Sequence, residues 1–189
     1  MSVIGIRQRK ENIYSKNMKL LMKKIRLLLI ALVAGLAIAA TFPMISTNDG
    51  EGAIFMDVKG KKFDEVLTQF KGKVVYIDFW ASWCGPCIGQ MPYSAKLHEK
   101  YKDKDVAFLY ISFDYTKEAW KRGVEKYKIK GYHWMPDKKQ MREIMKRFRV
   151  KGIPRYMLVS KKGEILTDDF LRPSSKRVPR YFDKALNLE

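Results

Sequence analysis

Cysteine is nearly absent from this 189-residue sequence, which contains only Cys84 and Cys87. Two cysteines cannot build a disulfide-rich scaffold, and they cannot supply the four thiolates of a structural zinc site. Histidine is as scarce, and His98 and His133 lie far apart without the spacing of metal ligands. We therefore expect no metal site, and no pattern in the sequence indicates another cofactor.

The longest apolar run, residues 27–40 (LLLIALVAGLAIAA), follows the basic segment 1–26. A basic flank and an apolar core that ends in small residues are typical of a cleaved export signal. The uncharged stretch 27–45 also approaches the roughly 20 residues that a membrane-spanning helix needs, so an uncleaved anchor is the other interpretation. Both interpretations place the rest of the chain on the extracytoplasmic, periplasmic side, with the basic flank inside.

Beyond the apolar run, residues 46–53 are polar and glycine-containing, which is typical of a linker, and residues 54–189 form the predicted folded domain. No cysteine follows the apolar run, which excludes a lipid-modified cysteine anchor. Residues 117–162 carry 16 basic and four acidic residues. Nucleic-acid binding would fit such a charge. Export argues against it, so we expect a solvated basic face, or attraction to anionic lipid headgroups.

Strand-like and helical patterns alternate along the domain. Residues 74–80 (VVYIDFW) and 105–114 (DVAFLYISFD) are almost continuously apolar, as expected of strands buried on both faces. Helices are predicted at 87–101, which Pro92 should kink, at 117–128, capped by Thr116, at 138–148 and after 175. A short edge strand is predicted at 131–136 and a hairpin at 155–170. This alternation predicts an α/β fold, with a central mixed sheet flanked by helices.

Both cysteines lie in DFWASWCGPC, between a predicted strand and a predicted helix. A bridge between residues so close constrains the unfolded chain little, which disfavours a purely structural disulfide. Cys84 at a helix N-terminus would favour the thiolate, and with partial exposure it would be the nucleophile. Cys87, one turn further in and more buried, could resolve a mixed disulfide. Pro86 suits the first turn of that helix. The other interpretation is a pair of small buried hydrophobic residues.

VVYIDFWASWCGPC, together with GIPRYMLVSKKGE at 152–164, resembles the thioredoxin superfamily. The similarity covers about residues 54–188 and is greatest to the TlpA/ResA-like exported thiol-disulfide oxidoreductases. It implies a thioredoxin fold that carries an N-terminal hairpin at 54–63 and a helix–strand insert at about 117–134.

The resemblance also assigns residues to the site. It makes Cys84 the attacking cysteine, Cys87 the resolving cysteine and Pro154 a cis-proline, where an ordinary trans turn is the alternative. The backbone of Ile153 would pair with an extended substrate peptide. The predicted motif and substrate groove comprises Trp83, Gly85, Pro86, Ile153, Pro154 and Arg155. An apolar docking surface is expected from Trp83, Ile88, Met91 and Ile153, and Arg155 would favour acidic partners or stabilise the thiolate.

An acid, Asp78, interrupts the apolar strand 74–80. An unpaired buried carboxylate is costly, so such a group stays neutral until it is needed, which fits a general base for Cys87. Thioredoxins have a buried aspartate here, and the resemblance implies the same role. The alternative is an acid at a strand end, paired with a basic residue. Two departures from the family are Tyr110, where thioredoxins have a lysine, and neutral Gln90, where many relatives have an acid.

Gly85-Pro86 is the dipeptide of strongly reducing thioredoxins. We therefore predict an exported enzyme that reduces disulfides in protein substrates and receives electrons from an upstream membrane thiol donor. Some relatives prepare apocytochrome c for haem attachment. Two other interpretations are a redox-inert thioredoxin-fold binding module and a thiol peroxidase.

Overall fold

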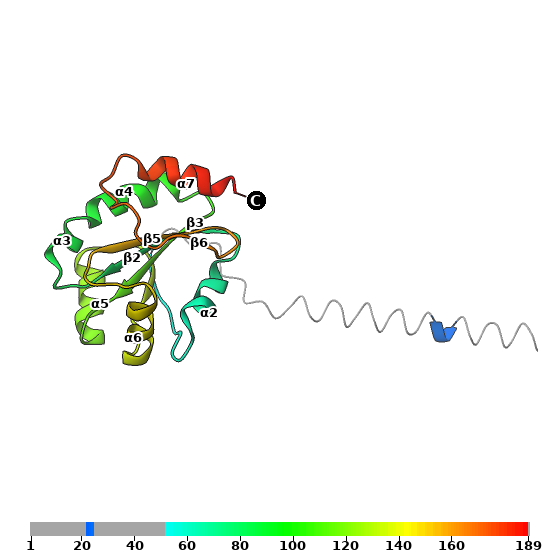
Figure 1. The fold of residues 1–189 in the computed structure, drawn as a ribbon, viewed down its shortest axis with the longest axis horizontal. Coiled ribbons are helices and arrows are strands. Elements are labelled where there is room, and N and C mark those ends of the chain that lie inside the picture. Colours follow the sequence, from blue (N-terminus) through cyan, green and yellow to red (C-terminus); the bar gives the residue numbers. More distant parts are fainter. Residues whose placement is uncertain (1–21, 25–51, 189) are drawn as a thin grey trace, which may run out of the picture. The chain divides into compact units, whose positions relative to one another are not determined.

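The computed structural model describes residues 22–24, which are helical and exposed, and residues 52–188. The predicted signal or membrane segment 27–45 lies outside the described residues, as do most of segments 1–26 and 46–53. Within the described ranges, no helix has both the length and the apolar character that crossing a bilayer requires. The fold described below is that of residues 52–188, which are coloured along the chain in Figure 1.

A mixed sheet of six strands forms the centre of the fold, in the order β1-β4-β3-β2-β5-β6. Neighbours from β1 to β2 run parallel, and β5 is antiparallel to both β2 and β6. The strands are β1 (Ala53–Phe55), β2 (Val74–Trp80), β3 (Val106–Ser112), β4 (Gly131–Trp134), β5 (Arg155–Val159) and β6 (Ile165–Thr167). This arrangement confirms the predicted mixed α/β fold.

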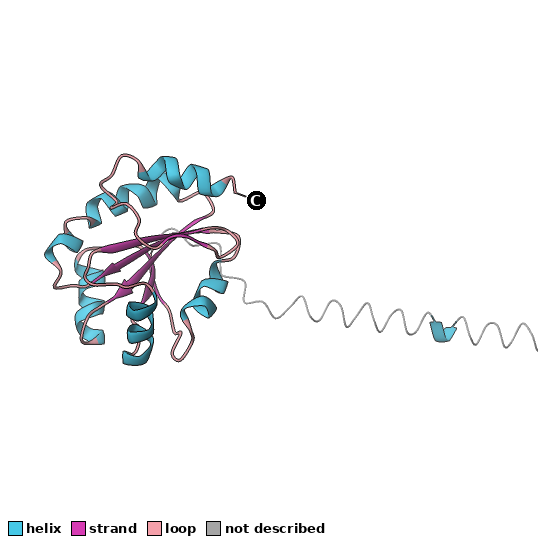
Figure 2. Ribbon diagram, viewed as in Figure 1, coloured by secondary structure: helices cyan, strands magenta, loops and turns pink. Residues whose placement is uncertain are grey.

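Helices cover both faces of the sheet, with α4 and α7 on one side and α2 and α6 on the other (Figures 1 and 2). They are α2 (Phe63–Leu67), the 3-10 turn η1 (Thr68–Phe70), α3 (Gly85–Ile88), α4 (Met91–Tyr101), α5 (Lys117–Lys126), α6 (Lys138–Arg147) and α7 (Val178–Leu186). Alternate residues of β2 and β3 contribute to two separate cores. The core on the α4 and α7 side contains both cysteines.

The predicted N-terminal hairpin at 54–63 is wrong. Strand β1 is followed by a turn at Gly60, and the chain then enters α2 without a return strand. Phe63, Val66 and Leu67 recur at helical spacing and are buried, while the backbone N–H of Lys62 donates to the Glu65 carboxylate at 2.8 Å. Strand β1 instead pairs in parallel with β4.

Two further elements differ from the sequence prediction. Strand β4 belongs to the predicted helix–strand insert, but it is not an edge strand, because β1 covers its outer side. The predicted helix 87–101 is broken between α3 and α4 rather than kinked. Pro92 explains the break, because it has no N–H to donate to the carbonyl of Ile88 and its ring would clash with that group. The helix restarts with Pro92 in its first turn.

Candidate redox-active site

Cys84 and Cys87 are joined by a disulfide in the turn between β2 and α3. Cys84 is the N-cap of α3, and its Sγ accepts a hydrogen bond from the backbone N–H of Cys87 at 3.2 Å. Cys84 is 4% exposed and Cys87 is fully buried. The predicted order of exposure is therefore confirmed. However, the expected partial exposure of Cys84 is not found in this disulfide state, because the surrounding core covers most of it.

Helix α3 contains only four residues, with Gly85 and Pro86 in its first turn. Its backbone dipole is correspondingly small, because the macrodipole is a sum over aligned peptide units. The N–H of Cys87 is therefore the group seen to favour negative charge on the Cys84 sulfur. The structure thus places the polarising donor inside the Cys-x-x-Cys turn itself.

A carboxylate at the end of β3 holds the segment that leads into the cysteines. Asp114 accepts hydrogen bonds from the Ser82 hydroxyl at 2.6 Å, from the Ser82 backbone N–H at 3.2 Å and from the Ser112 hydroxyl at 2.8 Å. Asp114 is not among the site residues predicted from the sequence. The signal was available, since Asp114 follows a buried strand and the carboxyl ends of neighbouring parallel strands lie together.

Trp83, the residue before Cys84, is 54% exposed and stacks against Tyr115 with ring centroids 6.0 Å apart. It borders an open groove of about 900 Å³ that extends along Met56–Lys59 and the start of α6. Of the other residues expected in a docking surface, Ile88 and Ile153 are half-buried. Met91 is buried, because it packs into the core that contains the cysteines, and it does not contribute to the surface.

The peptide bond between Ile153 and Pro154 is cis, as the resemblance implies, and the trans alternative is wrong. It precedes β5, the strand that pairs with β2 on the side away from β3. Within the described part of the chain, no backbone hydrogen bond involves Ile153. Its N–H and C=O are therefore available to another polypeptide segment.

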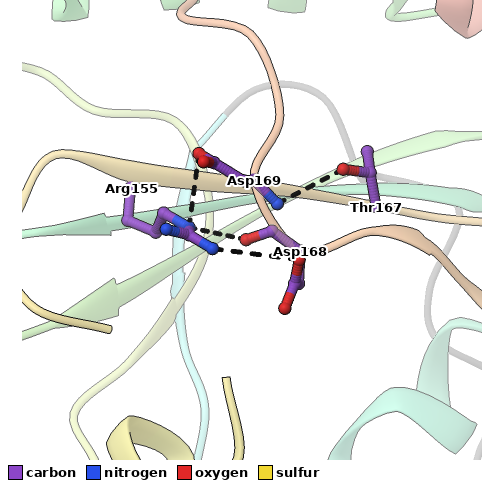
Figure 3. Close-up of polar contacts among 4 residues, drawn as sticks. All are labelled: Arg155, Thr167, Asp168 and Asp169. Carbon is purple, nitrogen blue, oxygen red and sulfur yellow. Dashed lines mark hydrogen bonds and ion pairs between the residues drawn. The ribbon is translucent and has the colours of Figure 1, made fainter. Parts of the chain in front are cut away.

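Arg155 is occupied by acidic groups from the segment after β6 (Figure 3). Its Nε donates to the backbone carbonyl of Asp168 at 2.6 Å, and its guanidinium lies 3.8 Å from the Asp168 carboxylate and 3.5 Å from that of Asp169. The side chain is only 21% exposed. These contacts favour a structural role for Arg155, whose side chain holds residues 168–169 next to the beginning of β5.

Asp78 lies in the middle of β2, with its side chain on the face of the sheet that contains the cysteines, and is 1% exposed. Its cross-strand neighbours are Tyr110 on β3 and Tyr156 on β5. Neither carboxyl oxygen has a hydrogen-bond partner among the described residues. Burial raises the pKa of Asp78 well above its ordinary value. The expected unpaired, buried acid is therefore found, and no ion pair to it is present in the described ranges.

The two departures from the family pattern are both visible in the structure. Tyr110 lies opposite Asp78 as expected, and its hydroxyl is hydrogen-bonded to the hydroxyl of Ser94 at 2.7 Å. The carbonyl oxygen of the Gln90 side chain accepts from the backbone N–H of Ser174 at 3.1 Å. Gln90 is therefore used to hold the loop before α7, and its amide cannot exchange a proton as a carboxylate would.

Comparisons with known proteins agree with this site. Residues 41–184 match the Redoxin family. The thiol-disulfide oxidoreductase ResA of Bacillus thuringiensis subsp. konkukian (strain 97-27) is 34% identical over 131 residues, which cover 69% of this chain and 73% of that protein. A ResA of Bacillus thuringiensis (strain Al Hakam) is 29% identical over 174 residues, or 89% and 98% of the two chains. The thioredoxin domain of a thiol-disulfide oxidoreductase from Bacteroides vulgatus superposes with a TM-score of 0.58 at 29% identity, covering 64% of this chain and 84% of that one.

Proposed function

The chain belongs to the Redoxin family as a TlpA/ResA-like thiol-disulfide oxidoreductase, and from this premise we propose that it reduces disulfides in exported proteins. The observation that carries the proposal is the Cys84–Cys87 disulfide, which lies on the same face of the sheet as Asp78, a buried acid without a partner among the described residues. A bridge across two residues is easily closed and opened, which suits a pair that cycles between dithiol and disulfide.

In the proposed reaction the reduced enzyme attacks through Cys84. Its thiolate forms a bond to one sulfur of the substrate disulfide, and the other substrate sulfur leaves as a thiolate that takes a proton from water. The Cys87 N–H, which donates to the Cys84 sulfur, favours the attacking thiolate. The product of this step is a mixed disulfide between Cys84 and the substrate.

Cys87 resolves the mixed disulfide. The Asp78 carboxylate takes the proton of the Cys87 thiol, directly or through a water. The new Cys87 thiolate bonds to the Cys84 sulfur, and the substrate leaves as its second thiolate. Two electrons thereby pass from the enzyme dithiol to the substrate, and the Cys84–Cys87 disulfide seen in the structure is formed.

Trp83, Ile153 and Pro154 are proposed to bind the substrate. The free backbone groups of Ile153 support this role, because an extended peptide can add to them in the manner of a strand. The exposed ring of Trp83 supplies apolar contact area beside Cys84. Arg155 has less part in binding, because Asp168 and Asp169 already offset its charge.

The reducing direction and the extracytoplasmic location are also part of the proposal. Gly85-Pro86 favours reduction, and an exported reductase needs an upstream thiol donor in the membrane to restore its dithiol. The basic segment 1–26 and the apolar run 27–40 support export, either as a retained anchor or as a cleaved signal. The protein substrate is defined here only as a disulfide-containing polypeptide.

Insulin reduction by a dithiol donor tests the activity. The wild-type protein is expected to accelerate precipitation of the insulin B chain, and Cys84→Ser is expected to abolish the acceleration. A wild-type protein no faster than Cys84→Ser would favour the redox-inert binding module. Rapid consumption of hydrogen peroxide without insulin reduction would favour the thiol peroxidase.

A further inference from the structure

Three buried tyrosines surround Asp78 on the cysteine side of the sheet. Tyr110 and Tyr156 are its direct cross-strand neighbours, and Tyr76 lies two residues before it on β2. Residues paired across neighbouring strands project to the same face, so these side chains share one layer with Asp78. Burial raises the pKa of each tyrosine, and the nearby Asp78 raises it further.

Two of the three hydroxyl groups are already engaged. The hydroxyl of Tyr76 donates to the backbone carbonyl of Leu171 at 2.8 Å, and that of Tyr110 is bonded to Ser94. The hydroxyl of Tyr156 is buried and has no hydrogen-bond partner in the described part of the chain. The Tyr156 ring is nevertheless held in place, because it stacks on the Tyr76 ring with centroids 5.6 Å apart and an interplanar angle of 6°.

Asp78 and Tyr156 therefore present complementary unsatisfied groups across one strand pair. An ionised carboxylate only accepts hydrogen bonds, and a protonated tyrosine hydroxyl can donate one. We propose that Tyr156 is a positioning residue that donates to the Asp78 carboxylate in the reduced enzyme, where the carboxylate must be ionised to receive the Cys87 proton. This inference rests on the proposed role of Asp78 as the general base.

None of the other charged or titratable groups around the pair is bonded to the Asp78 carboxyl among the described residues, while the indole N–H of Trp80, two residues further along β2, is a second buried donor without a partner there. Arg172, in the loop after β6, acts electrostatically on Tyr156 and is not paired with Asp78. His133 on β4 stacks on Tyr110 with centroids 5.1 Å apart, and burial lowers its pKa to about 4, so it is uncharged at neutral pH. Ser94 of α4 is bonded to Tyr110, and Cys87 of α3 lies in the same buried core as Tyr110 and Tyr156.

The strength of the proposed hydrogen bond depends on the charge of Asp78 during the reaction. While Asp78 is ionised, the Tyr156 hydroxyl stabilises it and keeps its own proton. When Asp78 takes the proton of Cys87, the carboxyl group becomes neutral and the hydrogen bond weakens. The structure contains the finished Cys84–Cys87 disulfide, and in it the Tyr156 hydroxyl and both Asp78 oxygens have no partner among the described residues. The proposed hydrogen bond is therefore not present in the disulfide state, and it forms only in the reduced enzyme with Asp78 ionised.

Tyr156→Phe tests the inference, because it removes the hydroxyl and keeps the ring. In the reduced protein, a ¹³C-detected titration of the Asp78 carboxyl should show its pKa higher by about one pH unit. The single-turnover resolution of a Cys84 mixed disulfide should be about tenfold slower below that pKa. The matched control is Tyr76→Phe, which loses a buried hydroxyl bonded to Leu171 and should leave the pH profile unchanged.

Thermal stability separates a positioning role from a structural one. Removal of an unpartnered buried hydroxyl should leave the melting temperature of oxidised Tyr156→Phe unchanged or raise it. Loss of stability with an unmoved pH profile would overturn the inference and show that the hydroxyl serves the fold.

Asp78→Asn separates failure of this inference from failure of the proposed mechanism. If Asp78→Asn is slow while Tyr156→Phe keeps the wild-type pH profile, the role of Tyr156 is overturned and Asp78 stays the base. If Asp78→Asn resolves the mixed disulfide at the wild-type rate, the general base itself is overturned, and Tyr156 with it. The double variant is expected to match Asp78→Asn alone, because the hydroxyl acts only through the carboxylate.

Discussion

Asp78 on β2 lies directly opposite Tyr110 on β3, and no basic side chain pairs with its carboxyl group in the described ranges of the chain. Burial alone therefore raises the pKa of Asp78, whereas a cation beside it would have favoured the ionised form. Ionising Asp78 in the folded protein therefore costs stability, and the same unpaired carboxyl group is free to accept the proton of Cys87 in the proposed mechanism.

The first prediction concerns the stability cost of Asp78. Its pKa is raised above the value of about 3.9 in the unfolded chain, so the folded protein binds the extra proton between these two pKa values. The free energy of unfolding contributed by this group therefore falls as pH rises through that window. Oxidised Asp78→Asn should be more stable than wild type at pH 8 by about 1 kcal/mol or more, and similar to it at pH 4. Urea unfolding at both pH values measures this, and a constant difference would contradict it.

The second prediction concerns the clamp between Asp114 and Ser82. Asp114→Ala leaves the half-buried N–H and hydroxyl of Ser82 and the buried hydroxyl of Ser112 without their acceptor, so the free energy of unfolding should fall by about 3 kcal/mol. Insulin reduction should also slow, because the segment before Cys84 loses its anchor. Asp103→Ala, at an exposed position, is the control and should change neither quantity. Equal behaviour of the two variants would show that the clamp does not hold the turn.

The third prediction concerns Gly123, where α5 approaches the same segment. A Cβ atom added to Gly123 would lie 2.6 Å from the Cβ of Ser82 and 3.3 Å from the ring of Trp80. Gly123→Ala should therefore destabilise the protein by about 1–3 kcal/mol and slow insulin reduction. Gly52→Ala is the control, because nothing lies within 4 Å of its added Cβ. Wild-type stability in Gly123→Ala would show that α5 can move away without cost.

The fourth prediction concerns acid sensitivity. Burial lowers the pKa of His133 to about 4, below the ordinary value of about 6.5. The unfolded chain therefore binds a proton that the folded protein does not bind between these values, and stability falls as pH drops from 6.5 toward 4.

His133→Phe should remove that loss. At pH 7.5 the variant should be less stable by about 1 kcal/mol, because it lacks the bond from Nε2–H to the Ile129 carbonyl at 3.0 Å. Between pH 7.5 and pH 4.5 the difference in the free energy of unfolding should shift in favour of the variant by about 2–3 kcal/mol. Calorimetric melting curves across this range give the comparison, and parallel stability curves would contradict a buried, neutral His133.

Local pattern was sufficient to predict the parts of the fold that depend on local chemistry. The apolar runs gave β2 and β3, and Thr116 caps α5 as predicted, with its hydroxyl accepting from the N–H of Ala119 at 3.2 Å. The cysteines and the cis-proline came from short motifs. The position of Asp78 inside a buried strand was visible because an acid there breaks an otherwise apolar run.

Contacts between segments distant in sequence were not predictable in this way. The parallel pairing of β1 with β4 joins residues that local periodicity does not relate, and the three residues of β1 are exposed and show no burial pattern. Tyr156 faces Asp78 only through the register of the antiparallel β2–β5 pair. The partners of Arg155 come from the segment after β6. Each of these depends on tertiary pairing, which a single sequence does not specify.

Trapping the mixed disulfide tests the central claim most directly. Reduced Cys87→Ser and reduced Cys84→Ser are each incubated with a disulfide-containing peptide, and the adducts are mapped by mass spectrometry. The account predicts that Cys87→Ser accumulates a stable adduct on Cys84, and that Cys84→Ser accumulates little or none, because Cys87 is fully buried. A predominant adduct on Cys87, or no adduct on Cys84, would contradict the assignment of Cys84 as the attacking and Cys87 as the resolving cysteine.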